Sequence, residues 1–175
     1  MGYTGGKTLN PTYSKLRDHT EAIQVEFDPK QISYRQLLAV FWKAHSPGTK
    51  PYSQQYKAAL WFHSKRQRKI ALETKAALAR KHKIKVYTEI LPAVRFYNAE
   101  EYHHKYYLRQ KRELVKDLRS LFPSFQAFLA SPTITRINGY VGGHGDIKGV
   151  QQSLRYLPLT PQARKILLAR IQRVR

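Results

Sequence analysis

The sequence predicts an α/β or α+β sandwich with a helical C-terminal extension. Strand-like and helix-like apolar patterns alternate over residues 1–107, whereas residues 108–175 carry helical patterns alone. The 175 residues contain no cysteine, which excludes a disulfide framework, a thiolate zinc site and a thiol nucleophile within them. We therefore expect a sheet-containing domain followed by a basic helical extension.

The first domain should begin with a turn-rich segment over 1–20, which holds Gly-Gly and Asn-Pro pairs. Partial alternation of apolar residues over 22–27 then predicts a strand. Ser33 and Gln36 form a capping box, so a helix should begin there and end before Pro47. The remaining elements expected in this domain are a strand over 58–62, a helix that opens at Ser64 with Gln67, and a strand over 84–91.

The rest of the chain is expected to be helical. Asn98 and Glu101 match the reciprocal capping pattern and predict one helix over 99–121. Further N-cap and glycine signals predict a short helix over 124–130, a helix from Ser131-Pro132 to Asn138-Gly139, a glycine turn at 142–145, and a last helix from Thr160-Pro161.

Short motifs follow one another in a specific order and spacing over residues 2–107. They are Gly2-Tyr3-Thr4-Gly5-Gly6, Asn10-Pro11-Thr12-Tyr13, His19-Thr20-Glu21, Phe41-Trp42 with His45 and Pro47, Gln55-Tyr56, Thr88-Glu89-Ile90, Phe96-Tyr97, Ala99-Glu100 and Tyr102-His103. Together they resemble the peptide methionine sulfoxide reductase A family. The stretch Asn138-Gly139-Tyr140 is similar to a C-terminal extension of some eukaryotic relatives.

The resemblance implies an α/β fold around a mixed sheet flanked by helices over residues 1–107, with residues 108–175 as a basic helical C-terminal extension. It also implies reduction of methionine S-sulfoxide in proteins, oxidised protein methionine as the partner, and no cofactor. It places Glu21 in the proton-donor position, and Tyr3 and Tyr56 in the positions whose hydroxyls hold the sulfoxide oxygen. A carboxylic acid suits protonation of a departing oxygen, and hydroxyl donors suit its stabilisation. The structural alternatives stay open: Glu21 as an ordinary strand-edge carboxylate, and both tyrosines as packed side chains.

Departures from the family pattern decide the functional expectation. The family's nucleophilic cysteine lies in a Gly-Cys-Phe-Trp segment upstream of the Gly-Tyr-x-Gly-Gly motif, and this sequence starts at the later motif. Pro51 or Tyr52 stands near the position of an Asp that usually precedes Gly-x-Gln-Tyr. We therefore expect an N-terminally truncated domain that lacks its first strand and helix and is inactive alone. It would be either a fragment of an active reductase or a decayed copy.

The charge points to a different class of function. Lys and Arg number 32 against 11 Asp and Glu, a formal net charge of +21. Such an excess favours contact with a polyanion. The alternative hypothesis is a basic pseudoenzyme that binds nucleic acid, for example ribosomal RNA, through two basic helices. The expected contacts are Lys65, Arg66, Arg68, Lys69, Arg164, Lys165, Arg170 and Arg173.

Several other classes are excluded or disfavoured. No run of about 18 apolar residues occurs, so no membrane span is expected. Met1 to Gly6 resembles neither a secretory signal nor a transit peptide, and we expect an intracellular protein, cytoplasmic or mitochondrial. His103 and His104 are adjacent and would point to different faces of a helix, so no metal site is expected.

Overall fold

The computed structural model describes residues 1–144, 147–156 and 159–172. The chain divides into two compact units, residues 1–100 and residues 101–175. The first is a mixed α/β unit and the second is helical, which confirms the predicted fold class. The domain boundary predicted after residue 107 stays a prediction.

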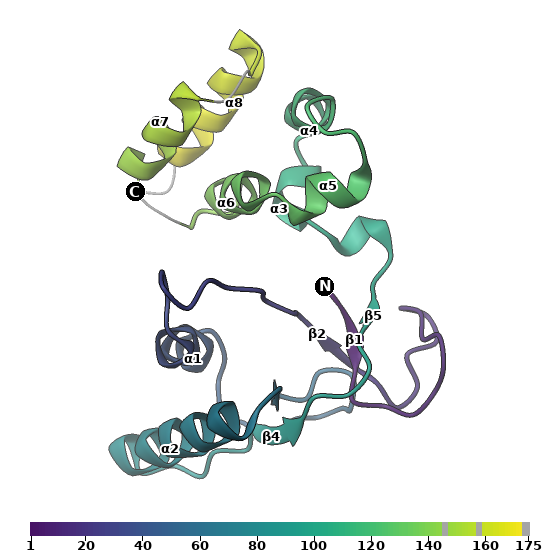
Figure 1. Ribbon diagram of the computed structural model, residues 1–175, viewed down its shortest axis with the longest axis vertical. Helices are drawn as coiled ribbons and strands as arrows, with labels where there is room; N and C mark the ends of the chain where they lie inside the picture. The colour runs from purple at the N-terminus through teal and green to yellow at the C-terminus, as the bar shows by residue number, and fades with distance from the viewer. Residues whose placement is uncertain (145–146, 157–158, 173–175) are drawn as a thin grey trace. The chain divides into compact units, whose positions relative to one another are not determined.

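Two small sheets organise the first unit (Figure 1). In the first sheet, β1 (Gly2–Thr4) lies between β2 (Thr20–Ala22) and β5 (Tyr97–Asn98) and is antiparallel to both. In the second sheet, β3 (Ala59–Phe62) pairs in parallel with β4 (Glu89–Pro92). The turn-rich reading of residues 1–20 therefore missed β1, whose three residues are buried.

Two helices supply most of the larger of the two apolar clusters of this unit. They are α1 (Tyr34–Lys43) and α2 (Lys65–His82), which pack against each other. The core contains Leu38 and Trp42 of α1, Leu60 of β3 and Ala71 of α2. Both predicted helix starts are confirmed. The Ser33 hydroxyl accepts a hydrogen bond from the Gln36 N–H and Ser64 accepts one from the Gln67 N–H.

Two strand predictions were wrong in their bounds. The strand expected over 22–27 ends at Ala22, because its partner β1 begins at Gly2, directly opposite Ala22. Beyond this point Ile23 and Val25 are 68% and 55% exposed, so their alternation reflects no buried sheet face. The strand expected over 84–91 begins at Glu89, because the preceding Tyr87 N–H bonds to the Pro47 carbonyl in a loop.

The second unit consists of short helices around one core. After a 3₁₀ turn (η1, Glu101–His103) come α3 (Tyr106–Arg109), α4 (Arg112–Arg119), α5 (Phe125–Ala130), α6 (Pro132–Val141), α7 (Ile147–Arg155) and α8 (Pro161–Gln172). Each of the helices α3 to α8 contributes to one apolar cluster. Leu108, Leu114, Ile134 and Leu167 of this cluster are fully buried, and α7 contributes Leu154. The starts predicted near 124, 131 and 160 are confirmed, and α7 was not predicted.

The single helix expected over 99–121 is wrong. The chain takes a left-handed conformation at Lys105 (φ 50°) and leaves helical geometry again at Lys111 (φ −115°, ψ 77°). A continuous helix would turn Leu108 and Leu114 roughly 120° apart. The breaks allow both side chains to be buried completely in the same core.

The end predicted for α6 at Asn138-Gly139 is also wrong. The Asn138 Oδ1 atom accepts a hydrogen bond from the Leu108 N–H of α3 at 3.1 Å. Asn138 therefore bonds to α3 through its side chain while its backbone remains part of α6. The helix continues to Val141, with Gly142 as its C-cap. Gly143 follows with φ 88°, so the left-handed residue lies after the helix and the expected turn falls there. Gly145 of that turn lies outside the described residues.

Candidate functional site

Strand pairing places two of the predicted site residues beside each other. Tyr3 lies in the central strand β1 and Glu21 lies opposite it in β2. Directly opposed residues of an antiparallel pair share one face of the sheet. The Tyr3 side chain is buried, at 2% exposure, whereas Glu21 is half-buried.

Gln55 connects Glu21 to the third predicted residue. Its amide nitrogen lies 2.6 Å from Glu21 Oε1 and 3.0 Å from the Tyr56 hydroxyl, and donates to both. The Glu21 N–H in turn donates to the Gln55 carbonyl at 3.0 Å. One side-chain amide therefore holds a carboxylate and a phenol at the same place, with Tyr56 still 47% exposed.

The Tyr56 hydroxyl keeps its proton over a wider pH range than usual. A hydrogen bond with the Tyr13 side chain raises its pKa above the ordinary value of 10.0, and desolvation and the nearby Glu21 charge act in the same direction. A phenol that stays protonated can act as a hydrogen-bond donor to an oxygen atom.

The structure adds Glu100 to the site, a residue that the sequence reading quoted in a motif and gave no role. The Tyr3 hydroxyl donates to Glu100 Oε2 at 2.6 Å, and the Tyr13 N–H donates to Glu100 Oε1 at 2.9 Å. The Tyr3 hydroxyl is thus engaged by Glu100, while Tyr56 is linked to Glu21. The signal available in the sequence was its place in the Ala99-Glu100 motif. The strand β5, which pairs with β1 just before Glu100, was not predicted.

The loop between β1 and β2 is held tightly against its own ends. Asp18 accepts hydrogen bonds from the N–H groups of Lys7 (2.6 Å) and Thr8 (3.3 Å). The buried His19 ring accepts from the Gly6 N–H through Nδ1, so its Nε2 carries the proton donated to the Thr8 carbonyl at 2.7 Å. These bonds position β2, and with it Glu21.

The arrangement can hold and protonate an oxygen atom of a small polar group, because it combines the Glu21 carboxyl group with the Tyr56 hydroxyl at one half-open place. It supplies no thiol, since the 175 residues contain no cysteine. Within the part of the chain that the structure describes, no group of three His, Asp or Glu side chains could hold a metal ion.

The family model for peptide methionine sulfoxide reductase matches residues 1–129. The chain belongs to this family. A peptide methionine sulfoxide reductase of Drosophila melanogaster is 35% identical over 167 residues, which are 94% of this chain and 67% of the fly protein. The enzyme MsrA of Sulfolobus acidocaldarius is 41% identical over 119 residues, 63% of this chain and 68% of that protein.

A solved structure agrees with the family assignment. Methionine sulfoxide reductase A of Corynebacterium diphtheriae matches with a TM-score of 0.52 and 29% identity, over 63% of this chain and 62% of the bacterial one. The expected resemblance is confirmed by these matches. The chain spans about two thirds of the length of these relatives.

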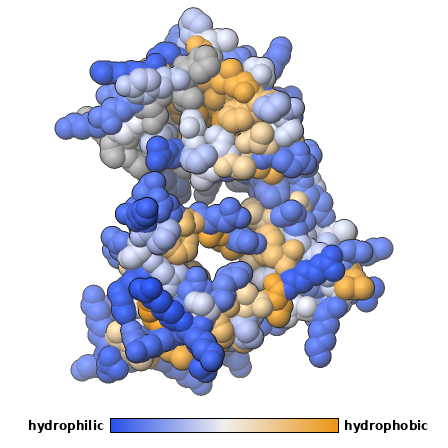
Figure 2. Space-filling model, in the orientation of Figure 1, coloured by the Kyte–Doolittle hydropathy of each residue, from blue (hydrophilic) through white to orange (hydrophobic). Residues whose placement is uncertain are grey.

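The basic residues predicted to bind nucleic acid belong to both units. Lys65, Arg66, Arg68 and Lys69 form the first turns of α2 and are all exposed. In Figure 2, hydrophilic residues cover the part of the surface where α2 lies in Figure 1. In α8, Lys165 is exposed and Arg164 is half-buried. Arg170 lies in the last turns of α8, and Arg173 lies outside the described residues. None of the described helices is long and apolar enough to cross a membrane.

Proposed function

We propose that Glu21, Tyr56 and Tyr3 form the oxygen-binding part of a methionine sulfoxide site, and that these 175 residues do not reduce the sulfoxide alone. The observation that carries the proposal is the shared Gln55 amide, which holds the Glu21 carboxylate and the Tyr56 hydroxyl together. The family to which the chain belongs acts on this class of substrate.

Each residue has a chemical role in the proposal. Glu21 in its protonated form provides the proton for the departing oxygen and is left as the carboxylate, and the Tyr56 hydroxyl donates a hydrogen bond to the same oxygen. Tyr3 lies opposite Glu21 on the same face of the sheet, and its hydroxyl is oriented by a 2.6 Å hydrogen bond that it donates to Glu100. Reduction to the sulfide also needs two electrons from a soft nucleophile that later forms a disulfide. No residue here provides one, because the sequence has no cysteine.

The first test is turnover of a peptide that contains methionine S-sulfoxide, with dithiothreitol as reductant. We expect no product above the blank. A rate that disappears in Glu21→Gln and persists in the matched exposed control Glu26→Gln would contradict the proposal of inactivity.

The second test is binding. Titration of the protein with methionine sulfoxide, followed by NMR, should shift resonances of Glu21 and Tyr56, whereas methionine, which lacks the oxygen, should not. Glu21→Gln and Tyr56→Phe should weaken the shift, and Glu26→Gln should leave it unchanged. Equal responses to the sulfoxide and to methionine would refute an oxygen-binding site.

A second candidate function is nucleic-acid binding by a basic pseudoenzyme, for example on RNA. The observation in its favour is α2, whose first turns expose Lys65, Arg66, Arg68 and Lys69 with no acidic residue among them. The next acid, Glu73, is occupied by Arg35 at 2.6 Å. Neutralised phosphates release counterions, so affinity should fall steeply with salt.

The salt dependence gives a quantitative prediction. If the protein neutralises about six phosphates, affinity should fall on the order of 10³-fold between 50 and 200 mM salt. Replacing the four α2 cations by Gln should lower the slope of log affinity against log salt by about 3 for a single strand. Filter binding across a salt series measures both values. No binding at 50 mM salt would remove this candidate.

A further inference from the structure

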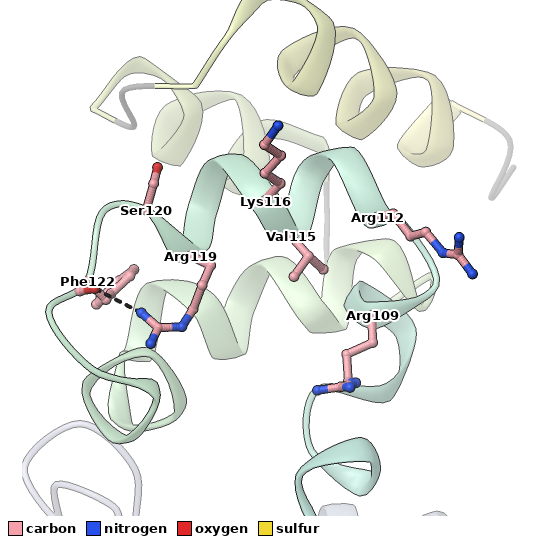
Figure 3. Close-up of a pocket in the computed structure, with 7 residues that line it drawn as sticks. All are labelled: Arg109, Arg112, Val115, Lys116, Arg119, Ser120 and Phe122. Atoms are coloured by element: carbon pink, nitrogen blue, oxygen red, sulfur yellow. Dashed lines mark hydrogen bonds between the residues drawn. The ribbon is translucent and has the colours of Figure 1, made fainter.

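A basic groove of about 700 Å³ is lined by α4, the end of α3 and the residues that follow α4 in the helical unit (Figure 3). Its cations are Arg109 at the end of α3 and Arg112, Lys116 and Arg119 of α4. Val115 and Phe122 provide apolar lining, and none of the described residues that line the groove is acidic. We propose that this groove binds the backbone of single-stranded nucleic acid.

The positive charge of the groove is not neutralised. In the described part of the chain, none of these four cations forms an ion pair. Arg109 and Arg119 donate only to backbone carbonyls, those of Glu101 (3.3 Å) and Phe122 (2.9 Å). Such bonds hold a guanidinium in place without cancelling its charge. The groove is therefore an anion site with two pre-oriented arginines.

Neither acid of α4 is among the residues that line the groove. Glu113, next to Arg112, is exposed and forms no ion pair within the described residues. Asp117 of α4 accepts hydrogen bonds from the N–H and hydroxyl of Thr160, the residue that caps α8. The helical unit as a whole carries 14 Lys and Arg against 4 Asp and Glu. The field around the groove is thus positive well beyond the four cations themselves.

The spacing of the cations favours a polymer over a small anion. Arg112, Lys116 and Arg119 recur at intervals of four and three residues, so they follow each other by about one helical turn of 5.4 Å. Figure 3 shows Arg112 and Arg119 at opposite ends of α4, with their guanidinium groups apart rather than converging on one point. A row of separated cations fits a chain of phosphates.

The apolar lining distinguishes a nucleic-acid strand from a membrane. Val115 and Phe122 are half-buried and pack against the core of the unit, and Phe122 lies edge-to-face with Phe128 at 5.7 Å. They can contact sugars and base faces beside the phosphates. Because they pack against the core, they offer little apolar area for insertion into lipid, which an amphipathic helix needs in addition to electrostatic attraction.

This proposal shares its ligand class with the second candidate function and assigns a separate site to it, in the other unit of the chain. It does not depend on the sulfoxide site. The experiment measures anisotropy of a fluorescein-labelled 20-nucleotide oligo(U) with the full chain, in a salt series from 50 to 200 mM.

The test variant is Arg109→Gln/Arg112→Gln/Lys116→Gln, which spares Arg119. Its matched control is Arg136→Gln/Lys148→Gln/Arg155→Gln, which removes the same residue types from exposed positions of α6 and α7 in the same unit. The groove variant should bind about 10-fold more weakly at 50 mM salt, with a salt slope lower by about 2. The control should change affinity by less than about 3-fold.

A smaller variant, Arg112→Gln/Lys116→Gln, removes two exposed side chains that form no hydrogen bond within the described residues. It should show the same trend with an intact circular dichroism spectrum. Equal losses in the groove variant and the control would overturn the proposal, because net charge alone would then explain binding. Equal affinity for polyglutamate or phosphatidylserine vesicles would also overturn it.

If the α2 variant abolishes binding and the groove variant does not, the groove proposal fails and the second candidate stands. The reverse result removes α2 as the binding site and supports the groove. No binding by the wild-type chain removes both.

Discussion

Asp18 illustrates how one exposed side chain organises the surroundings of the candidate site. Hydrogen bonds from the Lys7 N–H, and then from the side chain and N–H of Thr8, hold the pKa of the Asp18 carboxyl far below the ordinary 3.8. A lowered folded-state pKa means that the charged form stabilises the fold. This stabilisation is complete above pH 3.8 and is lost as the pH falls through the lower, folded-state value.

Asp18→Asn should therefore reduce the free energy of unfolding at pH 7, and the difference from the wild type should shrink as the pH is lowered below 3.8. Denaturant unfolding of both proteins between pH 7 and 2.5 measures this difference. Glu26→Gln, an exposed carboxylate in a loop, controls for the loss of a charge. A difference that stays constant across the pH range would show that the loop is held by other contacts.

At the scale of elements, α2 ends in a strained residue. Lys83, its C-cap, has φ 52° and ψ 41°, a left-handed conformation that disfavours a residue with a Cβ atom. Its side chain is exposed. Lys83→Gly should stabilise the protein by about 1 kcal/mol, because glycine adopts this conformation without the steric cost. Lys81→Gly, inside the same helix, should instead destabilise it by about 1 kcal/mol. Thermal unfolding compares the two, and a destabilising Lys83→Gly would contradict the strain.

For the whole molecule, the dominant feature is the formal net charge of +21. Like charges on a folded chain repel one another, and salt screens this repulsion over about 10 Å at 0.1 M. The melting temperature should therefore rise by a few degrees when NaCl increases from 10 to 300 mM. Differential scanning calorimetry measures the change. A falling melting temperature would mean that attractive ion pairs outweigh the repulsion. We do not expect this result, because the Arg35–Glu73 and Lys57–Glu89 pairs both involve exposed carboxylates and exposed pairs contribute little to stability.

Local signals were read correctly from the sequence where their contacts span only a few residues. Ser33, Ser64, Ser124 and Ser131 each cap the helix that was expected after them, because an N-cap bond joins residues three apart. The breaks at Lys105 and Lys111 were missed, because they follow from burial of Leu108 and Leu114 in a core that distant helices complete. The bounds of β2 likewise depend on its register with β1.

The sequence by itself determined the family, the α/β class, the lack of a thiol and the excess of positive charge, since motif order and composition need no coordinates. Only the tertiary structure decided which site residues meet: Tyr3 bonds Glu100, 97 residues away, while Gln55 joins Glu21 to Tyr56. It also decided that Arg109 and Arg119 line one groove across a break between helices. The physical reason is that such pairings depend on strand register and core packing, which bring together residues whose separation along the chain carries no local signal.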